Sequence, residues 1–282
     1  MGNAIEVSNL CKEYRGFALK NISFSVPEGL CCGFVGPNGA GKTTVLKAMT
    51  GMILKSSGEI CLLGRPNDDV KVKEEIGIVF DQPYFQESWT PLDIERSIKP
   101  FYPNWDDGEY QKYLSRFELD SKKKYKDFSR GMKMKLAMAV HLSHNARLLL
   151  LDEPTSGLDP ASRDELIDIM REYLVSEGRT ILFSTHITSD LEHIADLIVY
   201  ISQGSLLFCG EKDELTVSYC MVRGGRLPEE KRKFAIGLRE HDNGYECLME
   251  LAHIDGLPLD TITERAAIDD VIVHMERKEK YA

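Results

Sequence analysis

The sequence lacks the long apolar runs and processing signals that mark membrane-spanning or exported chains. No run approaches the roughly 20 apolar residues that cross a bilayer, and the opening residues, MGNAIEVSNL, show no charged segment followed by an apolar one. It also has no internal repeat and no low-complexity segment. We therefore expect an ordinary globular protein, and any link to a membrane would need a partner that supplies the span.

Paired cysteines and an excess of basic charge are absent as well. The seven cysteines include no CxxC pair and no His/Cys cluster at metal-ligand spacing, so neither a disulfide framework nor a zinc site is indicated. The 45 acidic residues outnumber the 35 basic ones and give a net charge of −10, which argues against broad binding to nucleic acid or anionic lipid. These absences predict a cytoplasmic location and no nucleic-acid partner.

The pattern of apolar residues indicates an α/β protein. With 282 residues, of which 43% are hydrophobic, the chain can form one full-sized domain and a small appendage. Residues 4–26 alternate as half-exposed strands do, which predicts a small antiparallel sheet. Apolar runs of strand length then alternate with helical stretches, at residues 31–35, 76–80, 148–151, 180–184 and 197–201. Because these runs are apolar on both faces, they predict a mainly parallel sheet covered by helices.

Two segments depart from this alternation. Residues 84–145 lack strand runs and contain both tryptophans, which predicts an inserted helical subdomain. After a last strand at 205–209, short strands and a final amphipathic helix are expected in the tail. The sequence thus predicts a main domain over residues 1–215 and a small α+β accessory region over residues 216–282.

The stretch GPNGAGKTT follows the first apolar run and is typical of a phosphate-binding loop. Its glycines allow a tight turn that points backbone N–H groups inward. Lys42 can reach the terminal phosphates, and Thr43 offers a hydroxyl to Mg²⁺. We therefore expect ATP to be bound by the loop residues Gly36, Pro37, Asn38, Gly39, Ala40, Gly41, Lys42, Thr43 and Thr44.

An acidic pair, Asp152 and Glu153, follows the four leucines at 148–151. The carboxyl end of a strand is where open parallel sheets bind their ligands. Asp152 would hold Mg²⁺, often through water, while Glu153 would polarise the water that attacks the γ-phosphate. An exposed Asp-Glu pair is common in isolation, but the leucines before it and PTSGLD directly after it favour the catalytic interpretation.

Five motifs occur together in a fixed order: the phosphate loop, SRGM at 129–132, LLLLDEP at 148–154, SGLD at 156–159 and the histidine of STH. Over residues 4–215 this order and spacing resemble the ATPase subunits of ABC transporters. The resemblance implies a P-loop NTPase core that hydrolyses ATP with Mg²⁺, and a head-to-tail dimer with a second ATPase subunit. It also implies attachment to the inner face of the cell membrane through an integral-membrane permease.

The resemblance further implies roles for single residues. Tyr14 matches the aromatic that stacks on adenine, although a plain tyrosine at a strand end remains the alternative. Ser129 and Gly131 match the signature that binds the γ-phosphate held by the other subunit. Asp159 matches a loop that touches the opposite subunit, and His186 matches the histidine that contacts the γ-phosphate.

Two motifs depart from the family pattern. The usual signature LSGGQ is FSRGM here, so Arg130 and Met132 replace a glycine and a glutamine. Arg130 either contacts phosphate or a partner, or faces solvent. The glutamine that senses Mg²⁺ should follow IGIVF directly, but that position is Asp81, and Gln82 comes one residue later. The register favours Asp81, which could reach Mg²⁺ through water, and both residues remain candidates.

VFDQPYF, FYPNW and SRGM together resemble the bacterial bacitracin-resistance and acetoin-utilisation type, which implies an exporter. The aromatics of the insert either line a groove for a permease helix or pack the subdomain's own core. A soluble ABC ATPase that moves no solute is one alternative, and a nucleotide-dependent regulator is another. The altered signature keeps the regulator open, whereas the intact Lys42, Glu153 and His186 count against it.

Overall fold

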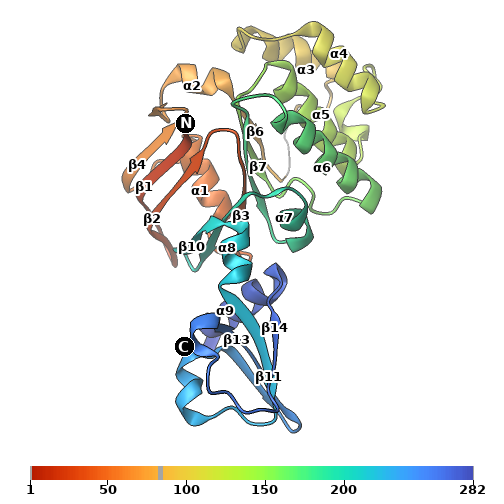
Figure 1. Ribbon diagram of the computed structural model, residues 1–282. Helices are drawn as coiled ribbons and strands as arrows, with labels where there is room; N and C mark the ends of the chain where they lie inside the picture. Colours follow the sequence, from red (N-terminus) through yellow and green to blue (C-terminus); the bar gives the residue numbers. More distant parts are fainter. Residues whose placement is uncertain (1, 82–84, 282) are drawn as a thin grey trace. The chain divides into compact units, whose positions relative to one another are not determined.

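The computed structural model describes residues 2–81 and 85–281 (Figure 1). Its contacts divide the chain into two compact units, Met1–Cys209 and Gly210–Ala282. The boundary expected from the sequence, after residue 215, lies slightly further along the chain. Unit 1 contains two sheets and unit 2 contains one, and each unit has its own apolar core.

The first sheet of unit 1 is antiparallel, as the alternating pattern predicts. β1 pairs with β2 on one side and with β4 on the other, so that Val7 lies opposite Phe24 and Ile60. These three side chains are buried, while their neighbours along each strand face outward. The sheet has the order β2-β1-β4-β5, with β1 (Asn3–Tyr14), β2 (Phe17–Pro27), β4 (Ser57–Leu62) and β5 (Arg65–Pro66).

The second sheet contains the predicted parallel strands. Four of its strand pairs are parallel, namely β3 with β8 and β9, β7 with β8, and β6 with β7. β3, β7 and β8 are buried at every residue, which explains their two-sided apolar sequences. The order is β10-β9-β3-β8-β7-β6, with β3 (Cys31–Val35), β6 (Ile76–Val79), β7 (Leu148–Asp152), β8 (Thr180–Thr185), β9 (Leu197–Ser202) and β10 (Ser205–Glu211).

Helices complete unit 1, and three of them form the inserted subdomain. Thr90 and Asp93 start the first of these through a capping box, and Ser129 caps the last. Figure 1 shows α3, α4 and α5 grouped at one side of the unit. The helices are α1 (Lys42–Met49), α2 (Val70–Glu75), α3 (Pro91–Ile98), α4 (Asp107–Arg116), α5 (Arg130–Ser143), α6 (Pro160–Leu174) and α7 (Thr188–Ile194), with 3₁₀ turns at Lys99–Phe101 and Tyr125–Asp127.

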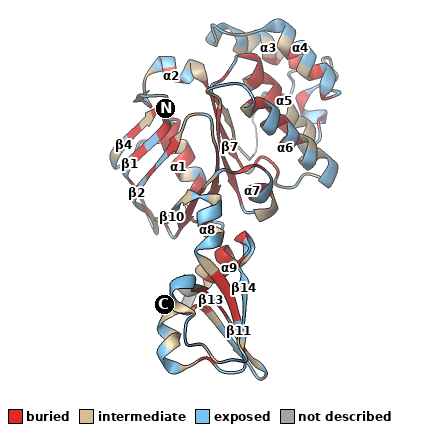
Figure 2. Cartoon of the chain, in the orientation of Figure 1, coloured by how far each residue is buried: buried red, intermediate tan, exposed pale blue. Residues whose placement is uncertain are grey.

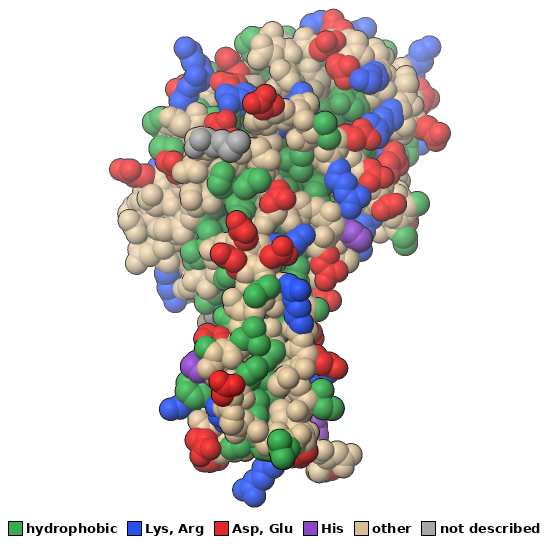
Figure 3. All heavy atoms as spheres, in the orientation of Figure 1, with side chains coloured by type: hydrophobic (Ala, Val, Ile, Leu, Met, Phe, Trp, Pro, Cys, Tyr) green, Lys and Arg blue, Asp and Glu red, His purple; other side chains and the backbone are tan. Residues whose placement is uncertain are grey.

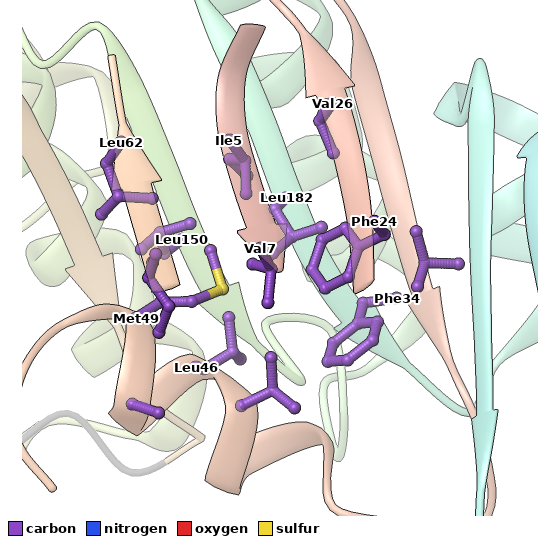
Figure 4. Close-up of a cluster of buried hydrophobic side chains, with 14 of the residues drawn as sticks. Ile5, Val7, Phe24, Val26, Phe34, Leu46, Met49, Leu62, Leu150 and Leu182 are labelled. Atoms are coloured by element: carbon purple, nitrogen blue, oxygen red, sulfur yellow. The ribbon is translucent and has the colours of Figure 1, made fainter. Parts of the chain in front are cut away.

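The core of unit 1 joins its two sheets through α1. Figure 4 shows Val7 and Phe24 of the antiparallel sheet facing Leu46 of α1 and Leu150 and Leu182 of the parallel sheet. All five belong to one buried cluster, and full burial of such a side chain stabilises a fold by about 1.5–3 kcal/mol. Figure 2 shows the same concentration of buried residues along β7 and the inner face of α5. This packing holds the carboxyl end of β3 and the start of α1 in a fixed relation.

Unit 2 is the expected small α+β region. Its antiparallel sheet packs Cys220, Val222, Tyr245, Cys247 and Met249 into a separate core. The final helix buries the apolar face that the sequence predicts. The sheet order is β12-β13-β11-β14, with α8 (Lys212–Val217), β11 (Tyr219–Gly224), β12 (Ile236–His241), β13 (Gly244–Glu250), β14 (Ile262–Arg265), α9 (Ile268–Tyr281) and 3₁₀ turns at Glu229–Phe234 and Leu251–His253.

Charge is distributed without a dominant patch on the face shown in Figure 3, where acidic and basic side chains are interspersed. Several are paired, such as Arg116 with Glu172 and Lys99 with Asp107. Among the residues that the structure describes, every helix is too short or too polar to traverse a lipid bilayer.

Candidate nucleotide-binding site

The phosphate loop connects the carboxyl end of β3 to the first turn of α1. Gly41 caps α1 with a φ of 110°, a left-handed conformation that favours glycine. A Cβ added there would lie 2.6 Å from Leu19 and 2.8 Å from Phe17, so β2 packs closely on the loop. The loop therefore leaves the N–H groups at the start of α1 open to an anion, where the helix dipole is positive.

Lys42 is buried beneath this loop. Its side chain is only 7% exposed, and its Nζ donates a hydrogen bond to Gly36 O at 2.6 Å. Glu153 Oε1 lies 3.3 Å from the same nitrogen. A buried ammonium group needs such partners, and a phosphate bound in the loop would be within reach of it. Lys42 Nζ thus lies at the phosphate loop, beside Gly36 O and Glu153.

Thr43 and Asp152 meet at the carboxyl end of the parallel sheet. Thr43 Oγ1 donates to Asp152 Oδ2 at 2.7 Å, and Ser184 Oγ donates to Asp152 Oδ1 at 2.6 Å. Asp152 is 2% exposed, and these hydroxyl groups satisfy its buried oxygens. A hydroxyl and a carboxylate side by side form the hard oxygen set that Mg²⁺ prefers, with phosphate and water completing its shell. These residues fit the ion.

Glu153 has a strained backbone conformation, and its carboxylate lies between the side chains of Lys42 and His186. Its φ is 52°, in the left-handed region that costs a non-glycine residue about 1–3 kcal/mol. Its backbone N–H donates to Ser184, which fixes the turn. One carboxylate oxygen faces Lys42, and the other lies 2.6 Å from His186 Nδ1. Strain of this kind concentrates at functional sites, and sequence patterns alone could not have revealed it.

A pocket of about 510 Å³ opens over these groups. Asp81 lines it together with the loop and the acidic pair. So does Phe17, which the sequence analysis missed; its only sequence signal is an aromatic directly after the Gly16 turn. The lining residues are Phe17, Pro37, Asn38, Gly39, Gly41, Lys42, Thr43, Thr44, Asp81, Asp152 and Glu153.

Tyr14 lies beside the pocket rather than in its lining. It is 47% exposed, pairs with Phe17 across the β1–β2 turn, and carries Lys12 Nζ 5.1 Å from its ring centroid. Within the described part of the chain, Phe17 is the aromatic that borders the phosphate loop. Tyr14 is nevertheless exposed at the rim, where a planar base could stack on it.

The signature residues lie together at the starts of α5 and α6, outside the pocket lining. Ser129 Oγ accepts the N–H of Met132 at 3.3 Å, and Asp159 accepts two hydrogen bonds from Ser162 at 2.7 and 3.0 Å. These bonds lower the pKa of Asp159 and keep it ionised. Gly131 packs close to Ser162 as well. None of Ser129, Gly131 and Asp159 lines the pocket over this chain's own phosphate loop.

The two departures from the family pattern contact each other. Arg130 Nη2 donates to Asp81 Oδ1 in an ion pair. The same guanidinium lies against Gly157, in the loop after Glu153. Gln82, the other candidate for the metal-sensing position, lies outside the described residues, as does Tyr84.

The fold and site together define a P-loop nucleotide-hydrolysing protein.

Comparison with known proteins gives the family. The family described as "ABC transporter" matches residues 19–156. The chain is 34% identical over 212 residues to the lantibiotic transport ATP-binding protein SrtF of Streptococcus pyogenes, covering 74% of this chain and 91% of the relative.

Two solved structures agree. An ATP-binding subunit of an ABC transporter matches with a TM-score of 0.69 and 27% identity, over 75% of this chain and 91% of that one. The second is cbiO1 of Clostridium perfringens, described as part of the ABC transporter complex cbiONQ; it matches with a TM-score of 0.64 and 26% identity, over 76% and 91%. The chain belongs to the ATP-binding subunits of ABC transporters, and its activity is ATP hydrolysis.

Proposed function

We propose that this chain powers a membrane permease as one half of a head-to-tail ATPase dimer, with Mg²⁺·ATP held at the pocket over Lys42. The observation that carries the proposal is the meeting of four expected groups in the pocket lining, with His186 in contact with one of them. Lys42 and Thr43 come from the phosphate loop, Asp152 and Glu153 from the end of β7, and His186 from the end of β8. These segments are far apart in sequence, and the sheet brings their side chains within bonding distance.

The residues divide the chemistry of ATP + H₂O to ADP + phosphate. Lys42 binds the terminal phosphates, and the loop N–H groups cradle the chain of anions. Thr43 and Asp152 would hold Mg²⁺, which would supply positive charge beside the phosphate oxygens. Glu153 accepts a proton from the attacking water, and His186 orients that carboxylate through the 2.6 Å contact to its Oε2.

A second subunit supplies what this chain's own pocket lacks. Ser129, Gly131 and Asp159 form one surface outside the pocket lining. In a twofold head-to-tail dimer this surface faces the nucleotide of the partner subunit, so that each site is completed by both chains. Closure would then exclude water and position the donors, and hydrolysis would release the dimer.

Membership of the family supports our proposal of a permease partner and of a cytoplasmic, membrane-peripheral location. SrtF is named for lantibiotic transport, and cbiO1 for a complex with further components. The exporter assignment rests on the motif resemblance at VFDQPYF, FYPNW and SRGM. A soluble ATPase that moves no solute would hydrolyse ATP without stimulation by a permease. A nucleotide-dependent regulator would hydrolyse almost no ATP.

The insert aromatics separate into packed and exposed side chains. Tyr102 stacks on His144 at 3.9 Å, and Trp105 packs against Tyr110 at 5.2 Å, so both serve the subdomain's own core. Phe101 is 73% exposed. Of these residues, Phe101 is the one that we propose contacts the permease, since a large exposed aromatic is suited to an interface.

Gel filtration of a Glu153→Gln variant tests the dimer. The variant should bind Mg²⁺·ATP without turning it over, and so elute as a dimer with Mg²⁺·ATP and as a monomer with EDTA. Glu172→Gln, which removes the same charge from the outer side of α6, is the matched control and should remain monomeric. A Glu153→Gln protein that binds Mg²⁺·ATP by calorimetry yet elutes as a monomer across a wide concentration range would contradict the dimer.

A further inference from the structure

We propose that Arg130 and Mg²⁺ compete for the carboxylate of Asp81, so that the ion pair between Asp81 and Arg130 opens when Mg²⁺·ATP binds. The pair would thereby link metal binding to the freedom of the signature at the start of α5. This inference rests on the proposed function, because it takes the pocket over Lys42 to be the Mg²⁺·ATP site. Its elements are a carboxylate in the pocket lining and a guanidinium outside it.

The sheet register puts Asp81 at the catalytic edge. β6 and β7 are parallel neighbours, with Val79 opposite Leu151. The segments that continue beyond these strands therefore run side by side, and Asp81 lines the same pocket as Thr43 and Asp152. A carboxylate at this edge can reach a cation bound there, directly or through water.

The carboxylates at this edge have different kinds of partners. Asp152 is held by two hydroxyl groups, and Glu153 by Lys42 and His186, all from the sheet and phosphate loop. Asp81 is paired instead with Arg130, the first residue of α5 in the helical subdomain. Of these contacts, this ion pair is the one that connects the pocket lining to the signature.

Arg130 also touches the loop that follows Glu153. A Cβ added at Gly157, whose φ is 69°, would lie 2.9 Å from Arg130 Nη1. One guanidinium thus contacts both the segment after β6 and the segment after β7. If Asp81 were released, Arg130 would keep only its contact with the loop at Gly157. The start of α5 would then be less constrained and could contact a second subunit.

The exposure of the pair makes the exchange feasible. The two side chains are 42% and 44% exposed, so solvent weakens their attraction. A divalent cation attracts the same carboxylate with twice the charge of a guanidinium. A glutamine at position 81 would have no net charge with which to hold Arg130. The ion pair therefore requires both departures from the family pattern, the aspartate at position 81 and the arginine at position 130.

Competition predicts effects of opposite sign on two forms of the nucleotide. Without Arg130, Asp81 is free for Mg²⁺, so binding of the Mg²⁺ complex strengthens. Without Arg130 and without Mg²⁺, the unpaired Asp81 carboxylate repels the phosphates, so binding of metal-free nucleotide weakens. A general effect of charge on an anionic ligand would instead weaken both.

The test is calorimetric titration of the full chain with adenylyl imidodiphosphate, a non-hydrolysable ATP analogue, in excess Mg²⁺ and in EDTA. Arg130→Gln should bind about two- to fivefold more tightly in Mg²⁺ and more weakly by a similar factor in EDTA, as expected for a solvent-exposed pair. Lys135→Gln is the matched control, because it removes the same charge from α5 and breaks a pair with Glu165. The control should leave both affinities unchanged.

A second variant separates the exchange from other roles of Arg130. In an Asp81→Asn background, Arg130→Gln should no longer strengthen binding of the analogue in Mg²⁺ or weaken it in EDTA. A change of the same sign in both solutions, or no change in either, would overturn the inference while the wild-type affinity still supports the nucleotide site. A wild-type chain that binds the analogue in neither solution would overturn the proposed function itself.

Discussion

Glu153 is the residue at which charge and backbone strain meet. Its carboxylate lies between Lys42 and His186, at 3.3 and 2.6 Å, on a backbone with a φ of 52°. Glutamine keeps the shape but cannot accept the proton of the attacking water. We expect Glu153→Gln to hydrolyse ATP about 10²–10⁴ times more slowly, the usual contribution of a positioned general base. Release of phosphate at saturating Mg²⁺·ATP measures it, and a rate within threefold of wild type would exclude this role.

We propose that Lys42 contributes its charge to nucleotide binding rather than to the stability of the fold. Because its Nζ contacts Gly36 O and Glu153 at the floor of the pocket, Lys42→Ala removes a charge-assisted partner of the phosphates. Such hydrogen bonds contribute about 1.5–3 kcal/mol, so nucleotide affinity should fall about 10- to 100-fold. Lys47→Ala, in the last turn of the same helix, is the control. Equal affinities of the two variants in calorimetry would refute the assignment of Lys42.

Motif residues could be predicted from the sequence because their chemistry depends on residue type and local spacing. Lys42, Asp152 and Glu153 all lie at the pocket as expected. Phe17 could not be predicted, since its place beside Gly41 depends on how β2 packs on the loop. The partner of Arg130 was equally hidden, because Asp81 is 49 residues away and the two meet only in the folded chain.

Among the elements, the turn between β9 and β10 connects the parallel sheet to β2 and to the phosphate loop through backbone hydrogen bonds. Gly204 O accepts the N–H of Lys20 at 2.7 Å, and Gly204 N donates to Ala40 O at 3.1 Å. Its φ is 76°, and an added Cβ would lie 1.8 Å from Ala18 O. Gly204→Ala therefore combines a left-handed alanine with a backbone collision, and should lower the free energy of unfolding by about 2–4 kcal/mol.

Gly178 provides the matched control for this change. Its φ of 75° is nearly the same, but nothing lies within 4 Å of an added Cβ. Gly178→Ala should therefore show the backbone cost alone, about 1–2 kcal/mol. Urea unfolding followed by circular dichroism compares the two variants. If both lost the same stability, the close packing of β2 on this turn would be wrong.

Element types were predictable from sequence period, whereas sheet order was not. Buried runs such as β3 and β7 are apolar on both faces, which only a covered parallel sheet requires. The antiparallel sheet, however, takes β4 as the second neighbour of β1, and a helix and two strands separate them in sequence. That pairing is decided by how the sheet packs over α1, and no local pattern encodes it.

At the scale of the whole molecule, the chain has two cores, and the nucleotide site belongs to the first. Every residue that lines the pocket lies between Phe17 and Glu153. The buried cluster of unit 2 is built from residues 220–249 and includes none of them. The small size of unit 2 leaves it with a modest core, and we propose that it serves dimer contacts or regulation rather than the chemistry of the site.

A chain ending at Glu211 tests this division, because it keeps all of β10 and removes everything from α8 onward. Sites that share no partners influence one another by only about 0.3–0.5 kcal/mol, so the shortened chain should bind Mg²⁺·adenylyl imidodiphosphate within about twofold of the full chain. Circular dichroism and cooperative urea unfolding would first show that unit 1 is folded. Calorimetry then compares the affinities, with Lys42→Ala in the shortened chain as the weak-binding control. A shortened chain that folds cooperatively but has lost its affinity would place part of the nucleotide site in unit 2.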